Sequence, residues 1–496
     1  AHSKGILLWG KNPFISSVHL LPLLREAKVR GARLVLIDPV RHKTASLADA
    51  CIAPRPGGDL ALALGVAALL FETGRVTPGA ASFCEGFDAF RSLALSKLPA
   101  AWAEEAGVGH DTLEVLASTL CDRPCNIQVG WGMGRRTNGS AIVRALDALG
   151  ALTGNLGIPG GGVSFYFKRR GAFDTSFLTK SSARTLSEPL LGREILEAKA
   201  PPIRAVWITA GNPVAMLPDS ATVARALETR ELVVVVDSFL TDTARRAHLV
   251  LPTTTLVEDD DLMGSYGNHW LGASVPVVTP PPEVKGDLEI VQLLAAEIDR
   301  RTDAGNRDGN GDGNAIAPKV AGSAREWKRR LLRRVAPMGV TVERLERESV
   351  RNPLAGNLVF EGAKFPTPNG KMRLLTAAPP PPEDEPGFPL WLFSNSTERA
   401  QSSQWAGPAP TVIEATCHPD AAPGLGDGAE VLLESAIGSL RARLKLDPLQ
   451  RPDVVVVPKG GHFDSGTCAN TLVKARLTDA GEGAAYLDCR VRIRPA

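Results

Sequence analysis

The chain has 496 residues, and its 56 Lys and Arg nearly balance 54 Asp and Glu, which leaves a net charge of only +2. This balance argues against a uniformly basic surface, so we expect no nucleic-acid partner. No uncharged apolar run approaches the roughly 20 residues that span a bilayer, and we expect no membrane helix. Seven cysteines without a Cys-x-x-Cys pair exclude a disulfide scaffold and argue against an iron–sulfur cluster held by this chain alone.

The chain enters an apolar stretch, residues 5–9 (GILLW), almost at once. A domain rarely begins on a core strand without a lead-in. We therefore expect further sequence upstream or on another polypeptide. At about 150 residues per domain, the length itself predicts about three domains.

An internal repeat organises the first half of the sequence. Its first copy begins with a strand around 6–8, followed by the turn Gly10-Lys-Asn12-Pro13 and a helix around 20–29. A second strand over 33–37 then ends in Asp38. This order predicts a βαβ unit.

The second copy repeats the same order. A strand over 205–208 leads into Gly211-Asn212-Pro213, a helix around 222–228, and a strand over 232–236 that ends in Asp237. The distance from Asn to Asp is 26 residues in the first copy (38 minus 12) and 25 in the second (237 minus 212). Both copies also have Thr-Ala at six and seven residues beyond the Asp. Eleven residues beyond the Asp, the first copy has Asp49 and the second has His248.

Each copy has the features of a nucleotide site. A Gly-containing turn after a buried strand lets backbone N–H groups approach a phosphate, and an acid that ends the next strand suits ribose hydroxyls. The alternative is a tight turn followed by a capping Asp. Neither copy contains Gly-x-Gly-x-x-Gly, so the NAD fingerprint is absent. Two matched copies favour a ligand with two nucleotide arms.

Further motifs follow in a fixed order. They are Trp9-Gly-Lys-Asn-Pro13, Ile37-Asp-Pro39 with Arg41 and Thr44-Ala45, Pro56-Gly-Gly-Asp59, Gly130-Trp-Gly-Met133, Thr153-Gly-Asn-Leu-Gly157 with Pro159-Gly160, Gly211-Asn-Pro213, Asp237 with Leu251-Pro252, and Phe365-Pro-Thr-Pro-Asn-Gly-Lys371. Over nearly the whole chain, this order resembles the molybdopterin oxidoreductases of the dimethyl sulfoxide reductase type, which include formate dehydrogenases and nitrate reductases.

The resemblance implies an α/β fold, with two pseudo-repeated dinucleotide-binding α/β domains plus a C-terminal double-psi β-barrel. We place the first domain at 1–165 and the second, incomplete without upstream sequence, at 166–378. The proline-rich segment 379–388 is expected to be a stiff linker. Short strands separated by turn residues predict the barrel over 389–496.

The resemblance also implies a molybdenum or tungsten ion held by two molybdopterin guanine dinucleotides. The implied residues around the first are Gly10, Asn12, Pro13, Asp38, Arg41, Thr44, Gly58, Asp59, Gly132 and Met133, although Met133 equally suits the core. Those around the second are Gly211, Asn212, Pro213, Asp237, Thr241 and Asp242. Polar loops of the barrel would add Ser394, Asn395, Arg399, Gln404, His462 and Asn470.

Three adjacent cations follow the Gly-rich crossover that starts at Thr153. Their place corresponds to that of a substrate-proximal arginine in formate-oxidising relatives. We expect Lys168 to contact the cofactor and Arg169 and Arg170 to contact the substrate. The alternative is a solvated basic loop.

One departure from the family concerns what precedes this chain. The family places a cysteine-bound iron–sulfur domain, half of one nucleotide domain and the metal-ligating side chain ahead of the point where this sequence begins. No residue here is identified as a metal ligand by motif. We expect a 4Fe–4S cluster on upstream sequence or on a partner.

The sequence thus predicts the catalytic subunit, or its C-terminal portion, of a molybdenum or tungsten oxidoreductase for a small substrate such as formate or an oxyanion. Its expected partner is an N-terminal iron–sulfur portion or a separate electron-transfer subunit. One alternative is a cofactor-free scaffold subunit, in which the phosphate turns and acids would have decayed. Another is a Rossmann-type enzyme with a free nucleotide. We expect a cytoplasmic location, or a periplasmic one if an export signal lies upstream.

Overall fold

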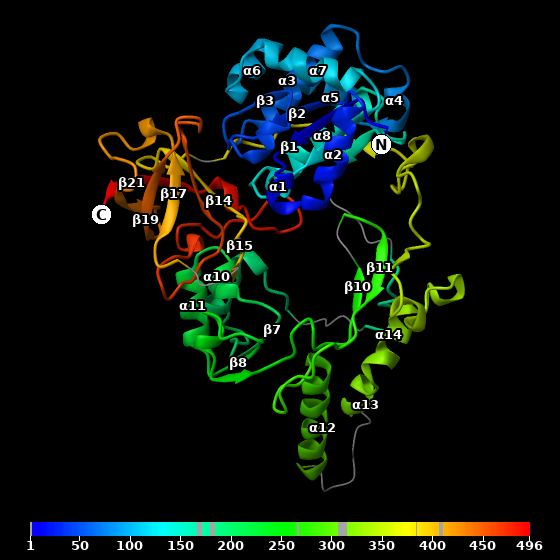
Figure 1. Cartoon of the computed structure of the whole chain (residues 1–496), viewed down its shortest axis with the longest axis vertical. Coiled ribbons are helices and arrows are strands. Elements are labelled where there is room, and N and C mark those ends of the chain that lie inside the picture. The colour runs from blue at the N-terminus through cyan, green and yellow to red at the C-terminus, as the bar shows by residue number, and fades with distance from the viewer. Residues whose placement is uncertain are drawn as a thin grey trace.

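The computed structural model describes residues 2–165, 171–178, 184–264, 267–305, 315–382, 384–405 and 410–496. Figure 1 shows two α/β units, a helical segment with a short antiparallel sheet, and a β-barrel that lies beside both units. Among these residues, no helix is long and apolar enough to cross a membrane.

The first unit is built on a parallel sheet with the strand order β3-β2-β1-β5-β6. The strands are β1 (Gly5–Trp9), β2 (Arg33–Ile37), β3 (Ala50–Ile52), β5 (Cys125–Val129) and β6 (Gly162–Ser164). All of β1 is buried, as its uninterrupted apolar sequence predicts for a parallel strand covered on both faces. The chain runs from β1 outward to β3 and then returns to place β5 on the other side of β1. The strand order therefore reverses between β1 and β5.

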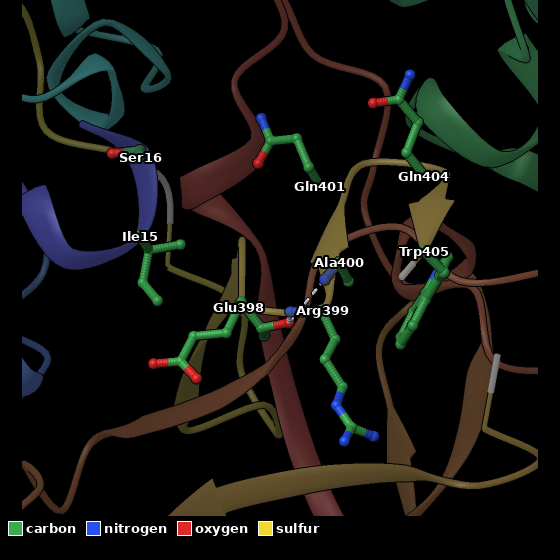
Figure 2. A pocket seen from close by; sticks show the side chains of 9 residues that line it. Ile15, Ser16, Glu398, Arg399, Ala400, Gln401, Gln404 and Trp405 are labelled. Atoms are coloured by element: carbon green, nitrogen blue, oxygen red, sulfur yellow. Dashed lines mark hydrogen bonds between the residues drawn. The ribbon is translucent and has the colours of Figure 1, made fainter. Parts of the chain in front are cut away.

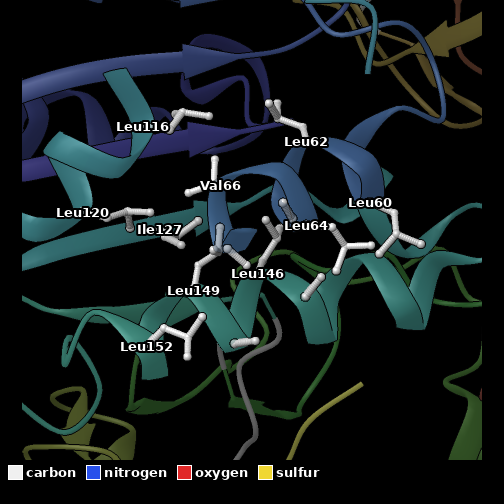
Figure 3. Packing of buried hydrophobic residues seen from close by; sticks show 14 of the residues in the cluster. Leu60, Leu62, Leu64, Val66, Leu116, Leu120, Ile127, Leu146, Leu149 and Leu152 are labelled. Atoms are coloured by element: carbon white, nitrogen blue, oxygen red, sulfur yellow. The ribbon is translucent and has the colours of Figure 1, made fainter. Parts of the chain in front are cut away.

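Helices cover both faces of this sheet. They are α1 (Pro13–Ser16), α2 (Leu21–Val29), α3 (Asp59–Glu72), α4 (Ala80–Phe83), α5 (Phe87–Ala94), α6 (Pro99–Ala106), α7 (Asp111–Cys121) and α8 (Gly139–Leu152). Apolar residues of α2 pack on one face, and those of α3, α7 and α8 pack on the other. Figure 3 shows leucines of α3, α7 and α8 around Ile127 of β5. Helix α3 is apolar on all sides because it lies inside this core.

The second unit has a smaller parallel sheet, β7-β8-β9. Its strands are β7 (Ala205–Thr209), β8 (Leu232–Val236) and β9 (Leu249–Leu251), and its helices are α9 (Leu191–Glu197), α10 (Pro213–Met216) and α11 (Ser220–Glu228). Both predicted βαβ copies are therefore confirmed, with parallel pairs β1–β2 and β7–β8.

The residues predicted as a single second domain, 166–378, contain more than one core. An antiparallel sheet of β10 (Leu262–Gly264), β11 (Trp270–Ala273) and β12 (Val350–Arg351) packs with α14 (Ala324–Leu332) and α15 (Val342–Leu345) around its own apolar cluster. Strand β13 (Met372–Arg373) pairs instead with β4 (Cys84–Glu85) of the first unit, and Leu374 joins the first unit's core. Pairing over such a long sequence separation leaves no local signal, which is why the prediction missed it.

Two further helices extend from this region. Helix α12 (Asp287–Gly305) leads downward in Figure 1, away from the first unit, and α13 (Ala317–Val320) packs beside it. The backbone N–H groups of Ile316 and Ala317 donate to the Asp299 carboxylate of α12, at 3.0 and 2.8 Å. These bonds hold α13 against α12.

The barrel closes through six strands in the order β14-β20-β17-β19-β18-β21. They are β14 (Leu390–Asn395), β17 (Ile413–Cys417), β18 (Glu430–Glu434), β19 (Ser439–Leu446), β20 (Val454–Pro458) and β21 (Arg490–Pro495), and alternate residues of β19 point into the core. A small hairpin, β15 (Ala400–Gln401) with β16 (Gln404–Trp405), extends from it. Two α/β units and a closed barrel agree with the predicted fold class.

Candidate cofactor site

The first turn lies at the carboxyl end of β1. Gly10 adopts a left-handed backbone (φ +62°), and a Cβ there would lie 2.6 Å from the Met133 side chain. Pro13 starts α1 directly after Asn12. The buried Thr44 hydroxyl donates to Asn12 Oδ1 at 3.1 Å, so this segment after β2 fixes the turn.

This turn meets a second one where the strand order reverses. A Cβ on Gly130, which follows β5, would lie only 1.6 Å from the carbonyl oxygen of Gly10. The two backbones approach this closely only because residue 130 is a glycine and has no Cβ. Ligands of open α/β sheets bind outside the carboxyl ends of the strands at such a reversal. Gly132 and Met133 lie in the same turn, with Met133 buried.

The second turn repeats the first with a shift of one residue. Asn212 is buried, and its Oδ1 accepts hydrogen bonds from the Thr243 hydroxyl (2.7 Å) and the Thr243 N–H (3.2 Å). Asn12 and Asn212 thus each accept a hydrogen bond from an equivalent threonine, Thr44 in the first copy and Thr243 in the second. The left-handed residue that corresponds to Gly10 is Ala210 (φ +53°), and Gly211 aligns with Lys11. The motif glycines Gly10 and Gly211 therefore occupy different positions in the two turns, whereas Asn12 and Asn212 are equivalent.

Both strand-ending acids form local turns. Asp38 Oδ1 accepts the Val40 N–H, and Asp237 Oδ1 accepts the Phe239 N–H, each at 2.9 Å. Asp38 Oδ2 also lies 3.3 Å from His42 Nε2. Neither acid caps a helix, since the short helices that follow begin after His42 and Thr243, so the capping alternative that the sequence left open is not what the structure has. Each carboxylate oxygen can accept more than one hydrogen bond, so these contacts leave capacity for a ligand.

Two predicted residues lie inside the first unit. The buried Asp59 accepts the Trp9 indole N–H at 2.8 Å, and burial raises the pKa of its carboxyl. A Cβ on Gly58 would lie 2.8 Å from the Ala106 carbonyl oxygen, so this glycine is required by packing. Both residues have a structural role that spacing could not indicate.

Arg41 lies at the contact between the first unit and the barrel. Its side chain is exposed, while its backbone N–H and carbonyl bond the Gln450 side chain at 3.1 and 3.0 Å. The barrel thereby fixes the segment that follows Asp38.

The second unit meets the barrel around Asp242. Its buried carboxylate accepts the Asp464 N–H at 3.1 Å, and its Oδ2 lies 3.4 Å from His462 Nδ1 without an oriented hydrogen bond. Asn470 donates to the Ala215 carbonyl oxygen at 2.8 Å and is buried. Two barrel loops thus meet the second unit here: His462 lies beside Asp242, and Asn470 packs against α10. Thr241 accepts the Ala244 N–H nearby.

A cavity of about 550 Å³ separates α1 from the hairpin β15–β16. Figure 2 shows Ile15 and Ser16 on one side and Arg399, Gln401 and Gln404 on the other. Two of the predicted barrel residues, Arg399 and Gln404, therefore line a space that helix α1, which follows the first turn, also borders. Ser394 and Asn395 end β14 nearby in the chain.

The sequence analysis missed Arg136. This arginine is 1% exposed, lies against the rings of Trp391 and Phe393, and donates to Asp488 Oδ1 at 2.8 Å. The other oxygen of Asp488 accepts the N–H and hydroxyl of Thr137. No sequence pattern links two residues so far apart, although Arg136 follows closely on the Gly130–Met133 motif.

The predicted substrate contacts, Lys168, Arg169 and Arg170, lie outside the described residues, and their assignment stays a prediction. Within the described ranges, no group of three or more His, Cys, Asp or Glu residues could hold a metal ion. We therefore name no metal ligand.

The donor set fits an anionic dinucleotide. Glycine turns open the backbone at the strand reversal, and several buried polar atoms have no protein partner: Arg136 Nε, Asn138 Oδ1 and Asp242 Oδ2. Arg136 and Asn138 follow the first motif turn, and Asp242 lies beside the second. Other buried polar atoms without hydrogen-bond partners are spread over the described chain, but these three lie where a bound anionic group would be able to reach them.

Comparisons with known proteins agree with this arrangement. The family model for molybdopterin oxidoreductase matches residues 1–297, and that for the molybdopterin dinucleotide binding domain matches 393–490. The chain is 29% identical to the probable oxidoreductase YyaE of Bacillus subtilis, over 100% of this chain and 76% of that protein. It is 32% identical to the assimilatory nitrate reductase of Haloferax mediterranei, over 78% of this chain and 58% of that protein.

A solved structure is similar over the whole chain. Acetylene hydratase from Pelobacter acetylenicus superposes with a TM-score of 0.79 at 20% sequence identity, over 100% of this chain and 78% of that one. At this identity the likeness concerns the fold alone. The chain is thus shorter than each of these three proteins.

Proposed function

The chain belongs to the molybdopterin oxidoreductase family, of the dimethyl sulfoxide reductase type, and we propose that it forms the catalytic portion of an enzyme that reduces a small oxyanion or N-oxide by two electrons. Similar proteins are named as nitrate reductases and as dimethyl sulfoxide or trimethylamine N-oxide reductases. The observation that carries the proposal is the matched pair of Asn–Thr turns on two units joined by one barrel.

In this proposal each unit holds one nucleotide arm of a bis-molybdopterin guanine dinucleotide. The group, when bound, supplies two-electron chemistry at its molybdenum or tungsten. The Gly10 N–H already donates to the Ile37 carbonyl at 2.7 Å, so backbone N–H groups at the equivalent positions Lys11 and Gly211 would approach phosphates. Asp38 and Asp237 would accept from ribose hydroxyls. The barrel would cover the site and exclude water, because it contacts both units.

Metal analysis and a substrate screen test this proposal. We expect natively purified protein to contain about one molybdenum or tungsten atom per chain and to oxidise a reduced viologen dye with nitrate or trimethylamine N-oxide. Oxidation is tested in the same screen by adding formate with an oxidised dye and following reduction of the dye. Asn212→Ala is expected to lose metal, because it removes the Thr243 contact, whereas the exposed Lys445→Gln keeps it. A chain without molybdenum or tungsten would instead support a cofactor-free scaffold.

We further propose that a second polypeptide segment, bearing an iron–sulfur cluster, completes the second unit. Among the described residues β7 pairs only with β8, although its counterpart β1 pairs on both sides. Trp207 of β7 is 41% exposed, and Val291, Leu294 and Ile298 form an exposed apolar stripe on α12. The occupant we propose is the part of the relatives' length that this chain does not match, 24% in the first relative.

Hydrogen exchange tests the completed sheet. Amides of β7 are expected to exchange at least about tenfold more slowly in natively purified, iron-containing protein than in the recombinant chain alone. Amides of β1, already paired on both sides, serve as the internal control and stay equally slow in both samples. Equal exchange of β7 in two samples that differ in iron content would refute the proposed docking.

A further inference from the structure

Two cations that form no ion pair with any described residue lie where the three main parts of the molecule meet. Arg135 follows the turn after β5, and Lys459 follows β20 of the barrel. The Arg135 guanidinium carbon and the Lys459 Nζ lie 5.8 and 5.9 Å from the centre of the Tyr486 ring. The Tyr486 hydroxyl in turn donates to the Met216 carbonyl oxygen of α10, at 2.8 Å. The first unit, the barrel and the second unit thus converge on one ring.

The backbone holds these groups in place. Leu487 N–H donates to the Arg135 carbonyl at 3.0 Å, and Lys459 N–H donates to the Asn395 carbonyl at 2.7 Å. Burial raises the pKa of Tyr486 to about 12, so the phenol stays neutral and keeps its bond to Met216. The two cationic side chains therefore project from fixed backbone positions beside a fixed ring.

The electrostatics of the cluster are unbalanced. Neither the Arg135 nor the Lys459 side chain forms a hydrogen bond or an ion pair with any described residue. Burial lowers the pKa of Lys459, and the neighbouring Arg135 charge lowers it further. Glu188 acts on Tyr486, but no carboxylate acts on Lys459. Two half-buried like charges destabilise a protein unless an anion joins them.

We infer that Arg135 and Lys459 bind a pyrophosphate group. Pyrophosphate carries two separate anionic centres, which match two separate cations, and Arg binds phosphate oxygens in a bidentate manner. The assignment rests on the proposed function, since a dinucleotide spanning both units would carry such a group near their meeting point. It differs from the sequence-based expectations, none of which included either residue.

Binding of inorganic pyrophosphate to the full-length apo chain tests the site, with GDP and nitrate as comparison ligands. Titration calorimetry is expected to show binding of pyrophosphate and GDP that weakens by about tenfold or more in Lys459→Gln and in Arg135→Gln. Lys459→Arg should restore most of the affinity. The matched control is Lys445→Gln, on strand β19 of the same barrel, whose ammonium pairs with Glu414. This variant should bind as the wild type does.

A second measurement needs no titration. Acetylation of Lys459, followed by mass spectrometry, is expected to slow at least about fivefold when pyrophosphate is present, because the bound anion keeps the amine protonated. Lys445 should acetylate at the same rate in both samples.

The outcomes separate the two proposals. Tighter binding of nitrate than of pyrophosphate would assign the cations to a substrate. Equal pyrophosphate affinity in the wild type, Lys459→Gln and Arg135→Gln would overturn the site. Neither result depends on metal content, which tests the proposed function independently.

Discussion

Strands β1 and β7 begin two copies of the same unit, yet their surroundings differ. β1 is buried along its whole length between two neighbours. Residues of β7 are alternately half-buried and exposed, and in the described part of the chain β7 has one neighbour, β8. The hydrogen bonds after the strands are nevertheless alike: each Asn accepts from a Thr, and each acid accepts an N–H two residues later. The two copies thus keep the turn in common while the sheet around it varies.

The acids of the two units follow the same contrast. Burial raises the pKa of Asp59, and that of Asp147 to about 7, in the first unit. In the second unit, Arg204 holds the pKa of Glu231 below its usual range. The contrast holds for these acids: Asp59 is buried in the first unit and Glu231 is exposed in the second, although the second unit also buries Asp242.

The largest effect should come from the buried pair that attaches the barrel to the first unit. Arg136→Met leaves the buried Asp488 without its cation and should cost about 3–5 kcal/mol of unfolding free energy. Denaturant unfolding of the apo chain measures this. Arg204→Met, which removes an exposed pair from the second unit, should lower the midpoint far less. Equal unfolding midpoints for the two variants would contradict the proposed difference between the buried pair Arg136–Asp488 and the exposed pair Arg204–Glu231.

Substitution of glycine by alanine should lower stability at Gly130 and leave it unchanged or raise it at Gly211. Gly130→Ala places a Cβ against the Gly10 carbonyl and should destabilise by about 1–3 kcal/mol or more. Gly211→Ala meets nothing closer than 3.8 Å and should be neutral or stabilise by about 0.4–1 kcal/mol. Thermal unfolding of both apo variants checks the signs. A loss in Gly211→Ala as large as in Gly130→Ala would show that the two turns are equally crowded.

Stability against pH should also separate the units. The pKa of Asp147 is raised from 3.8 to about 7, so its carboxyl binds a proton more tightly in the folded state. Its favourable contribution is complete below the unfolded pKa and is lost as the pH rises to about 7. Asp147→Asn should therefore be more stable than the wild type at about pH 8 and similar to it at about pH 4.

Glu231 provides the opposite sign. Its pKa is lowered, so its contribution is present above the ordinary value of 4.5 and is lost as the pH falls through the lower folded value. Glu231→Gln should therefore be slightly less stable than the wild type at neutral pH and equally stable in acid. Parallel pH profiles for Asp147→Asn and Glu231→Gln would contradict the contrast in burial.

The smallest effect concerns the left-handed residue after each strand. Ala210→Gly should stabilise the second unit by about 0.5–1 kcal/mol, because glycine adopts φ +53° without steric cost. Gly10→Ala should destabilise the first unit, where a Cβ would also meet Met133. Thermal unfolding of both variants measures the difference, and a lower midpoint for Ala210→Gly would show that the turn requires the alanine methyl group.

Local patterns predicted the βαβ copies and the barrel, because strand periodicity and turn residues are properties of neighbours in sequence. They also placed Asn12, Asn212 and the matched Thr-Ala pairs correctly. At plus eleven, Asp49 and His248 even have the same role, each accepting the N–H of the second residue of a strand, at 2.8 and 3.0 Å. This equivalence appears in spacing although the two residues differ chemically.

What spacing could not predict depends on packing between distant segments. Asp59 lies in a motif where the sequence predicts a ligand contact, but in the structure its carboxylate accepts a hydrogen bond from the Trp9 indole inside the core. The role of Arg136 requires Asp488, and the cations Arg135 and Lys459 meet only when the barrel docks. The left-handed residue after the strand is Gly10 in one copy and Ala210 in the other, so the position of the motif glycine alone does not identify it.

The contact between Arg136 and Asp488 also has a consequence for biosynthesis. The two residues are 352 positions apart, and a ribosome adds about 5–20 residues per second. The guanidinium therefore exists for about 20 to 70 s before the carboxylate that neutralises it has been translated. During that interval the first unit has its sheet but not its counter-charge, which makes attachment of the barrel the late event in maturation and leaves the ends of β1 and β5 accessible until then.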